Sequence, residues 1–186
     1  RVRASLVETA MRLFAERGFD GVTVDEIAAQ SDVSRRTFFR YFPTKEAVVF
    51  ARREEQLEHF RETLAHVKDE APFAAIRVAL LTLADDYAAR REQVLAERTL
   101  MRSAPALLAH DLEVDRAYES VIAEHFLAHS RRTVGDRRRA RMVAAAMVAV
   151  VRVVLEEWAE REGEVDLPKI GNDALELLEP MAPRLR

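Results

Sequence analysis

Apolar residues recur along the chain at helical spacing, and no segment alternates them with polar residues as a half-buried strand would. In residues 3–17 they stand at Leu6, Ala10, Leu13 and Phe14, three or four positions apart. The same period predicts further helices over residues 24–30, 34–42, 45–67, from 72 onward, 93–102, 111–130, 137–161 and 168–178. The pattern therefore predicts an all-α fold of about nine helices.

Capping residues mark the limits of two short helices near the N-terminus. Thr23 and Glu26 have the spacing of a capping box, and Ser34 is a second N-cap candidate. Residues 31–33 lie between the two helices, and Pro43 ends the second one. Two short helices joined by so few residues are typical of a helix-turn-helix.

The second of these helices is basic, and no acidic residue occurs from Val33 to Lys45. Phe38 and Phe42 share one face, which favours a core role, while Arg36 and Arg40 share another. In a helix-turn-helix the second helix enters the DNA major groove. For any one arginine a solvated helix face is an equally simple explanation, but the caps, the turn and the basic face together indicate DNA binding.

The segments Ala15–Phe19, Val22–Ala28 and Val33–Glu46 resemble the tetracycline-repressor (TetR) family of transcriptional regulators. The resemblance implies two parts, a helix-turn-helix DNA-binding domain over residues 1–46 and a helical effector-binding and dimerisation domain over residues 47–186. It also implies that phosphates are contacted by Thr23, Ser34, Tyr41 and Lys45, and that the groove is faced by Arg35, Arg36, Thr37, Phe39 and Arg40. The family usually has tyrosine at the position of Phe39, which can still pack against a thymine methyl group.

Composition narrows the class of protein. The net charge is -3, but residues 1–45 contain eight Lys and Arg against six Asp and Glu, as expected for a basic head on an acidic body. The chain has no cysteine and no catalytic motif, so we expect neither an enzyme nor a cofactor site. A metal site is not expected either, because His125 and His129 lack a clear third ligand. The longest apolar run, residues 143–155, is too short to cross a bilayer, and a cytoplasmic protein is expected.

That apolar run has a further consequence. It contains a single polar residue, Arg152, and a helix that is apolar on all sides must be covered on all sides. One face of this helix is expected to pack against a second protomer, as the family's four-helix dimer bundle implies. The alternative is a helix that is wholly internal to one protomer. The expected interface residues are Val148, Val151, Leu155, Leu175 and Leu178.

Aromatic, methionine and arginine residues in the body are candidates for an effector pocket, although such residues are core more often than pocket. The candidates are Tyr87, Arg98, Met101, Arg102, Tyr118, Ile122, Phe126, Met147, Arg152 and Trp158. Arg98 and Arg102 are four residues apart and suited to an anionic head group, whereas Arg152 can simply pair with Glu156. Residues 95–105 resemble an actinobacterial branch of the family that answers acyl-coenzyme A or other lipophilic effectors.

A second basic cluster covers the loop before the expected helix over residues 137–161 and the start of that helix, at Arg131, Arg132, Arg137, Arg138, Arg139 and Arg141. A solvated face is the simple interpretation, and an acidic partner or a coenzyme phosphate is the alternative. Taken together, the sequence predicts a ligand-responsive regulator that binds a pseudo-palindromic operator as a homodimer. The alternative is a helical module that binds a protein partner.

Overall fold

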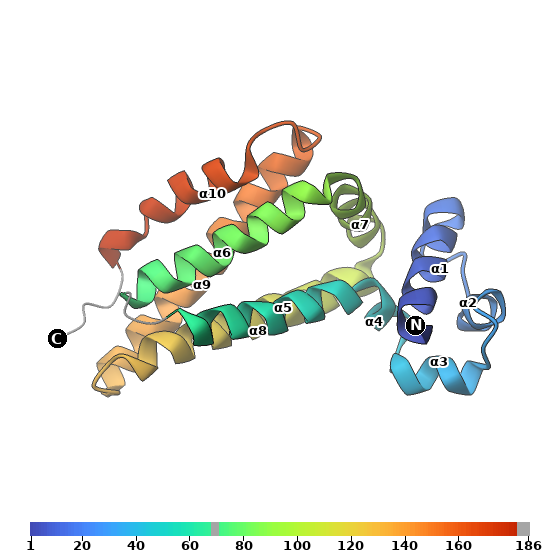
Figure 1. The fold of residues 1–186 in the computed structure, drawn as a ribbon, viewed down its shortest axis with the longest axis horizontal. Coiled ribbons are helices and arrows are strands. Elements are labelled where there is room, and N and C mark those ends of the chain that lie inside the picture. Colours follow the sequence, from blue (N-terminus) through green and yellow to red (C-terminus); the bar gives the residue numbers. More distant parts are fainter. Residues whose placement is uncertain (68–70, 182–186) are drawn as a thin grey trace. The chain divides into compact units, whose positions relative to one another are not determined.

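The computed structural model describes residues 1–67 and 71–181, and its regular elements within these ranges are all helices, which confirms the expected all-α class (Figure 1). The described residues form ten α-helices and one final 3-10 turn. In chain order they are α1 (Val2–Arg17), α2 (Val24–Gln30), α3 (Arg35–Tyr41), α4 (Lys45–Val49), α5 (Ala51–His66), α6 (Pro72–Ala89), α7 (Arg91–Ser103), α8 (Pro105–Ala128), α9 (Val134–Glu160), α10 (Leu167–Glu176) and η1 (Glu179–Met181). None of the described helices has the length and apolar character needed to cross a membrane.

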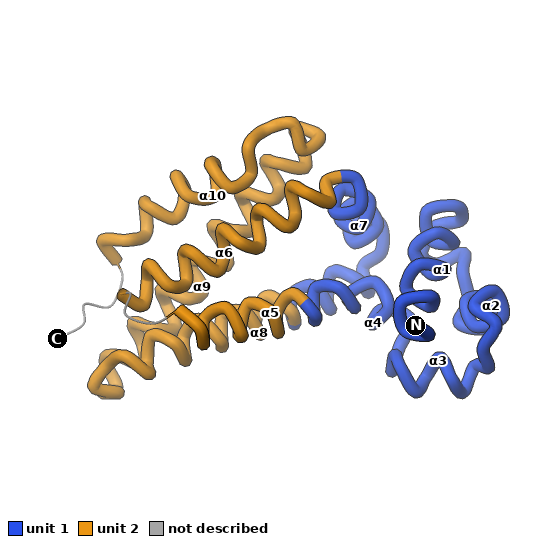
Figure 2. Tube along the Cα trace, in the orientation of Figure 1, with its two compact units in different colours: residues 1–55, 92–113 blue, residues 56–91, 114–186 orange. Residues whose placement is uncertain are grey.

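The helices form two compact units (Figure 2). Unit 1 consists of residues 1–55 and 92–113, and unit 2 of residues 56–91 and 114–186. The division falls inside α5 and α8, so both helices contribute to both units. The boundary expected after residue 46 lies within unit 1.

In unit 1, α1, α2 and α3 enclose a small apolar core. Its fully buried side chains come from all three helices and include Leu6, Phe14, Ile27 and Phe38. Gly18 follows α1 with a φ of 74° and donates its backbone N–H to the carbonyl of Phe14. Glycine is suited to this position because it tolerates positive φ without steric cost.

The helix expected over residues 45–67 is in fact two helices. It ends at Val49 and resumes at Ala51, with Phe50 between α4 and α5. The Phe50 side chain is fully buried, and its ring lies 4.5 Å from the ring of His110 in the same unit. The helical period continues through the break without a glycine or proline, so the sequence pattern does not predict it.

Two helix starts also lie earlier than expected. Helix α8 begins at Pro105, six residues before the expected start at residue 111. Proline is favoured in the first turn because its missing N–H is not needed there. Helix α9 begins at Val134, because Thr133 and Asp136 form a capping box. Gly135 lies in that first turn.

In unit 2, α10 packs against both α6 and α9. The largest buried side chains of this unit include Trp158, Phe126, Ile76 and Ile122. Helix α9 is not covered on every side within the protomer, since Val153 in its apolar run is 60% exposed. The alternative of a wholly internal helix is therefore wrong for the single chain.

Candidate DNA-binding surface and effector cavity

Helix α3 turns its two central arginines away from the core. Phe38 is fully buried, while Arg36 and Arg40 are exposed. Because successive residues are rotated by about 100° around a helix, positions two before and two after Phe38 lie nearly opposite its ring. The sequence therefore places both guanidinium groups on the outermost face of α3.

The start of α3 is fixed by Ser34. Its hydroxyl oxygen accepts a hydrogen bond from the backbone N–H of Thr37 at 3.1 Å, and the two hydroxyl groups of Ser34 and Thr37 are 3.0 Å apart. The predicted N-cap is confirmed. Its local geometry orients the first turn of α3, where a recognition helix makes its base contacts.

The start of α2 is fixed by the predicted capping box. Glu26 accepts hydrogen bonds from the backbone N–H and the hydroxyl group of Thr23, both at 2.8 Å, and donates its own N–H to the Thr23 hydroxyl. A side-chain hydrogen bond from Arg17, followed by those from Thr23, lowers the pKa of Glu26 from 4.5 to about 2. Both donors of Thr23 are therefore directed to Glu26, and a phosphate contact by Thr23 requires one of them to be released.

Other cations around α3 are braced by neighbouring groups. Arg35 donates to the Asp25 carboxylate at 2.7 Å, and its guanidinium lies 5.2 Å from the centre of the Phe39 ring. The Arg40 guanidinium lies 5.1 Å from the Tyr41 ring. Within the residues that the structure describes, Arg36 has no ion pair. Arg36 is thus the cation of α3 most available to a ligand.

The side chain of Lys45 is turned toward the protein. Its ammonium group donates to the carbonyl oxygens of Phe19 at 2.8 Å and Val22 at 2.9 Å, and it lies 4.1 Å from the centre of the Phe19 ring. An ammonium group has three donors, so one remains for the phosphate contact that the resemblance implied. This bracing role was missed because the two carbonyls are more than twenty residues away in sequence.

The remaining predicted DNA-binding residues lie on the flanks of α3. Phe39 and Tyr41 are 41% and 37% exposed, unusually high for aromatic rings, and Thr37 is half-buried. The rings are on opposite sides of the Arg36–Arg40 face, because they are separated by two residues along the helix. The outer surface of α3 therefore combines two guanidinium groups with two aromatic edges.

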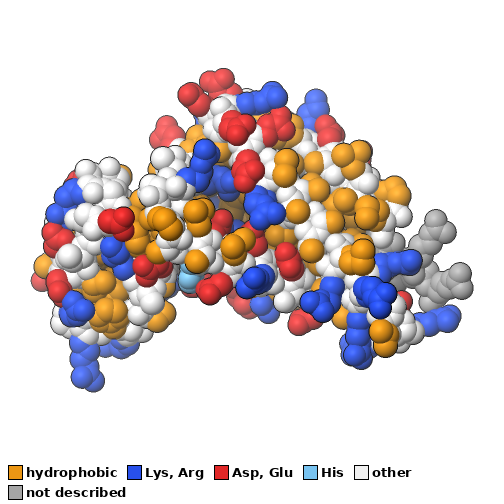
Figure 3. Space-filling model, turned by 180° about the vertical axis from the view of Figure 1, so that it is seen from behind, with side chains coloured by type: hydrophobic (Ala, Val, Ile, Leu, Met, Phe, Trp, Pro, Cys, Tyr) orange, Lys and Arg blue, Asp and Glu red, His pale blue; other side chains and the backbone are white. Residues whose placement is uncertain are grey.

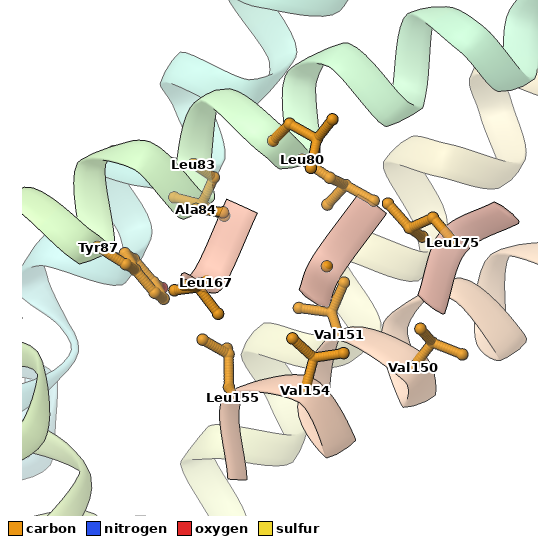
Figure 4. A pocket seen from close by; sticks show the side chains of 12 residues that line it. Leu80, Leu83, Ala84, Tyr87, Val150, Val151, Val154, Leu155, Leu167 and Leu175 are labelled. Carbon is orange, nitrogen blue, oxygen red and sulfur yellow. The ribbon is translucent and has the colours of Figure 1, made fainter. Parts of the chain in front are cut away.

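Unit 2 contains an apolar cavity between α6, α9 and α10, with a volume of about 30 Å³ (Figure 4). Its lining residues are Leu80, Leu81, Leu83, Ala84, Tyr87, Val150, Val151, Val154, Leu155, Leu167, Gly171 and Leu175. Of the predicted effector residues, Tyr87 alone lines it. The leucines of α6 were recognised in the sequence as a helical apolar face, but that pattern does not distinguish core from cavity.

The other predicted effector residues do not gather at this cavity. Tyr118, Ile122, Phe126, Met147 and Trp158 are buried core residues of unit 2. Arg98, Met101 and Arg102 belong to unit 1. Arg152 is exposed and lies 4.0 Å from Asp115, rather than pairing with Glu156 as expected. The ten candidates therefore do not form one pocket.

The five predicted dimer-interface residues are buried or half-buried within the protomer. Val151, Leu155 and Leu175 line the cavity inside unit 2, Val148 is buried, and Leu178 is half-buried. Val151, Leu155 and Leu178 remain partly exposed in the single chain, so the dimer interface stays a prediction. Among the described residues, the exposed large apolar side chains of α9 and the segment after it are Val134, Met142, Val153, Leu177 and Met181.

Comparison with known proteins gives consistent matches over both units. Residues 6–51 match the model for bacterial regulatory proteins of the tetR family, and residues 70–183 match that for the MftR C-terminal domain. TcmR, a transcriptional regulator of Streptomyces glaucescens, is 30% identical over 192 residues, covering 100% of this chain and 84% of TcmR. MftR of Mycobacterium tuberculosis is 28% identical over 159 residues, covering 83% of this chain and 78% of MftR.

Among solved structures, the transcriptional repressor FadR of Thermus thermophilus, determined in complex with lauroyl-CoA, has a TM-score of 0.64 and 27% identity. The match covers 98% of this chain and 96% of FadR. A family model that spans the greater part of the chain and a relative aligned along its whole length agree with the capped helix-turn-helix. The chain therefore belongs to the tetR family of bacterial regulatory proteins and is a DNA-binding transcriptional regulator.

Proposed function

We propose that the protein is a homodimeric repressor that reads a pseudo-palindromic operator with α3 and leaves it when a lipophilic effector binds. The observation that carries the DNA-binding part is the outward position of Arg36 and Arg40, opposite the buried Phe38, on a helix whose start is fixed by Ser34. A recognition helix needs such a one-sided arrangement, because one face meets the base edges and the other holds the helix on its domain.

The side chains of α3 take different roles in this proposal. Arg36 and Arg40 hydrogen-bond to base edges, since arginine pairs with guanine through two parallel bonds. Phe39 packs against a thymine methyl group or a sugar. Ser34 and Tyr41 contact phosphates and set the register of the helix on the duplex. Thr23 and Lys45 have smaller roles toward DNA, because most of their donors already serve the fold.

The dimer in this proposal is formed by the exposed apolar side chains of Val153, Leu177 and Met181. Exposed large apolar side chains are frequent at interfaces between copies, and a two-fold axis brings the same residues of each protomer together. Operator binding then requires the two α3 helices to be separated by one turn of DNA, ~34–36 Å.

The effector in this proposal enters between α6, α9 and α10. A cavity of about 30 Å³ is too small for it, because pockets for small molecules measure ~300–1,000 Å³. Binding must therefore displace α10, and α10 leads into the residues proposed for the dimer interface. An effector that binds the expanded state more tightly shifts the population away from the DNA-binding dimer. Lauroyl-CoA is the first molecule to test, because FadR of Thermus thermophilus was crystallised with it.

Fluorescence anisotropy with DNA fragments that flank the protein's own gene tests the DNA-binding part. Arg36→Ala and Arg40→Ala should each weaken binding to the preferred fragment ~10- to 100-fold and relax its sequence preference. Arg61→Ala on α5 is the matched control, since it removes an exposed arginine outside the helix-turn-helix. Equal binding by the α3 variants and the parent would refute the assignment of α3.

Addition of lauroyl-CoA to the same complex tests the effector part separately. Release of DNA by lauroyl-CoA but not by free coenzyme A is the expected result. If specific DNA binding is unchanged by lauroyl-CoA, then lauroyl-CoA is not the effector, but the proposed role of α3 is unaffected. A stable dimer that binds no duplex at low salt would instead favour a helical protein-binding module.

A further inference from the structure

An open groove of about 910 Å³ runs between α8 and α9 within unit 2. The groove is lined by Arg116, Glu119, Ser120, Ala123, Glu124, Leu127, Val134, Arg137, Arg138, Arg141, Met142 and Ala145. Figure 3 shows Lys and Arg side chains gathered beside hydrophobic ones at the end of unit 2 where α8 meets α9. The groove and the apolar cavity have no lining residue in common.

The four arginines of the groove are not neutralised within the protomer. Arg116 projects from α8, and Arg137, Arg138 and Arg141 project from α9, so guanidinium groups line both walls. Over residues 1–67 and 71–181 none of these four forms an ion pair, and they outnumber the two glutamates of the groove. The groove therefore carries a positive excess that the fold itself does not compensate.

Apolar side chains lie beside these cations. Val134 and Met142 are 76% and 63% exposed, and both line the groove together with Leu127. An exposed valine and an exposed methionine next to guanidinium groups give the groove two chemical characters. A ligand that satisfies both must carry an anion and an apolar portion.

The geometry points to a binding site for an amphipathic phosphomonoester, distinct from both the DNA-reading helix and the apolar cavity. Guanidinium groups bind phosphoryl oxygens through paired hydrogen bonds, and a phosphomonoester carries about two negative charges at neutral pH, which matches the excess of arginine over glutamate. The volume lies within the range of small-molecule sites, ~300–1,000 Å³. A concave surface with cations on both walls suits a small ligand better than a flat protein face.

Hexyl phosphate is a suitable probe, because it combines a phosphomonoester with a short apolar chain. Isothermal titration calorimetry on the full chain should show binding at least tenfold tighter for hexyl phosphate than for inorganic phosphate or hexan-1-ol. Each comparison probe has only one of the two groups that the groove accommodates. Equal affinity for hexyl phosphate and hexan-1-ol would overturn the proposal, since the arginines would then contribute nothing.

Two double variants locate the site. Arg138→Gln with Arg141→Gln removes two charges from the groove and should weaken hexyl phosphate binding tenfold or more. Arg131→Gln with Arg132→Gln removes two charges from the adjoining residues, outside the groove, and should change binding less than twofold. An equal loss in both variants would overturn the proposal, because it would reduce the effect to net charge. Circular dichroism of each variant checks that the fold is retained.

Two further results would replace the small ligand by another partner. If the groove variant bound hexyl phosphate like the parent but dissociated from dimer to monomer in sedimentation velocity, the groove would be a contact between copies of the chain. If the parent cosedimented with phosphatidylglycerol vesicles but did not bind soluble hexyl phosphate, the groove would face a membrane surface. Either result contradicts the proposed site. The experiment needs neither operator DNA nor the effector, so its failure leaves the proposed function untouched.

Discussion

Several cations of the helix-turn-helix segment are tied to neighbouring elements, whereas the groove arginines at the α8–α9 end of unit 2 have no ion pair among the described residues. Arg17 pairs with Glu26, Arg35 pairs with Asp25, and Lys45 donates to two backbone carbonyls. The arginines of the α8–α9 groove form no ion pair within the described part of the chain. In the first region these contacts link α1 to α2, α2 to α3, and α4 to the loop between α1 and α2, and in the second the positive charge is available to a ligand.

Basic side chains in this protein therefore have two roles: some stabilise the fold, and others are free to bind a ligand. Helices of seven residues, such as α2 and α3, are too short to be stable by themselves. Their caps and cross-links are therefore part of the fold, and only Arg36 and Arg40 of the outer face are proposed to read bases. Helix α9 has 27 residues and several buried apolar side chains, and its groove arginines Arg137, Arg138 and Arg141 form no ion pair among the described residues.

The largest effect should come from Lys45→Met, which keeps an apolar stem over the Phe19 ring but removes both hydrogen bonds to the carbonyls. Loss of charge-assisted bonds at a half-buried site should lower the free energy of unfolding of the head by about 2 kcal/mol. Trp158 is the chain's single tryptophan and lies in unit 2. Urea unfolding should therefore shift in circular dichroism more than in tryptophan fluorescence.

Arg36→Met is the matched control for this variant. Arg36 is exposed and unpaired among the described residues, so its loss should change stability by less than about 0.5 kcal/mol. If Lys45→Met left stability unchanged and instead lowered the salt dependence of DNA binding by one phosphate contact, Lys45 would belong with the free cations. The claim that cations of the helix-turn-helix segment stabilise the fold would then be wrong for Lys45.

A smaller effect is expected at Gly171 of α10, which lines the apolar cavity. A Cβ added there would meet the Leu81 side chain at 3.9 Å, an ordinary contact distance. Gly171→Ala should therefore raise the free energy of unfolding by about 0.5–1 kcal/mol, because alanine favours the helix, and should raise the concentration of lauroyl-CoA needed to release DNA. Tryptophan fluorescence in urea measures the first change.

Gly163→Ala provides the opposite control. Gly163 has a φ of 70°, and a Cβ there would lie 2.8 Å from the Arg91 Cγ atom. This substitution should destabilise unit 2, since alanine disfavours positive φ. Destabilisation by Gly171→Ala as well would mean that α10 is packed more tightly against α6 than the cavity indicates.

The sequence was informative where structure is decided locally. The capping box of Thr23 and Glu26 and the cap of Ser34 were predictable, because each depends on residues three positions apart. The orientation of α9 could not be predicted, because a helix that is apolar on every side has no polar face to show which side is buried. Val151 and Leu155 were therefore expected at a dimer interface but line a cavity. The break at Phe50 and the partners of Lys45 depend on contacts distant in sequence, which helical periodicity does not reveal.

Asp25→Asn tests whether a braced arginine can be released. Asp25 and Arg35 are both well exposed, at 63% and 59%, so breaking their ion pair should cost about 0.5 kcal/mol or less. DNA binding should tighten several-fold at low salt, because a negative charge near the phosphates is lost and Arg35 becomes available. Glu16→Gln on α1, which breaks the exposed pair with Arg12, is the control. Weaker DNA binding by Asp25→Asn in anisotropy would show that the brace holds Arg35 in its binding position.

The smallest effect is the pH dependence of the α2 cap. The pKa of Glu26 is lowered from 4.5 to about 2, chiefly by the hydrogen bond from Arg17. A carboxyl group whose pKa is lower in the folded state contributes stability that is complete above its ordinary pKa and is lost as the pH falls toward the folded value. Glu26→Gln can still accept the capping bonds but lacks the charge. The parent should therefore have the higher melting temperature at pH 6, and the difference should vanish between pH 4.5 and 2, measured by circular dichroism at matched ionic strength. A difference that persisted at pH 2 would mean that Glu26 stabilises α2 through its uncharged hydrogen bonds, and the cross-link to Arg17 would then contribute little.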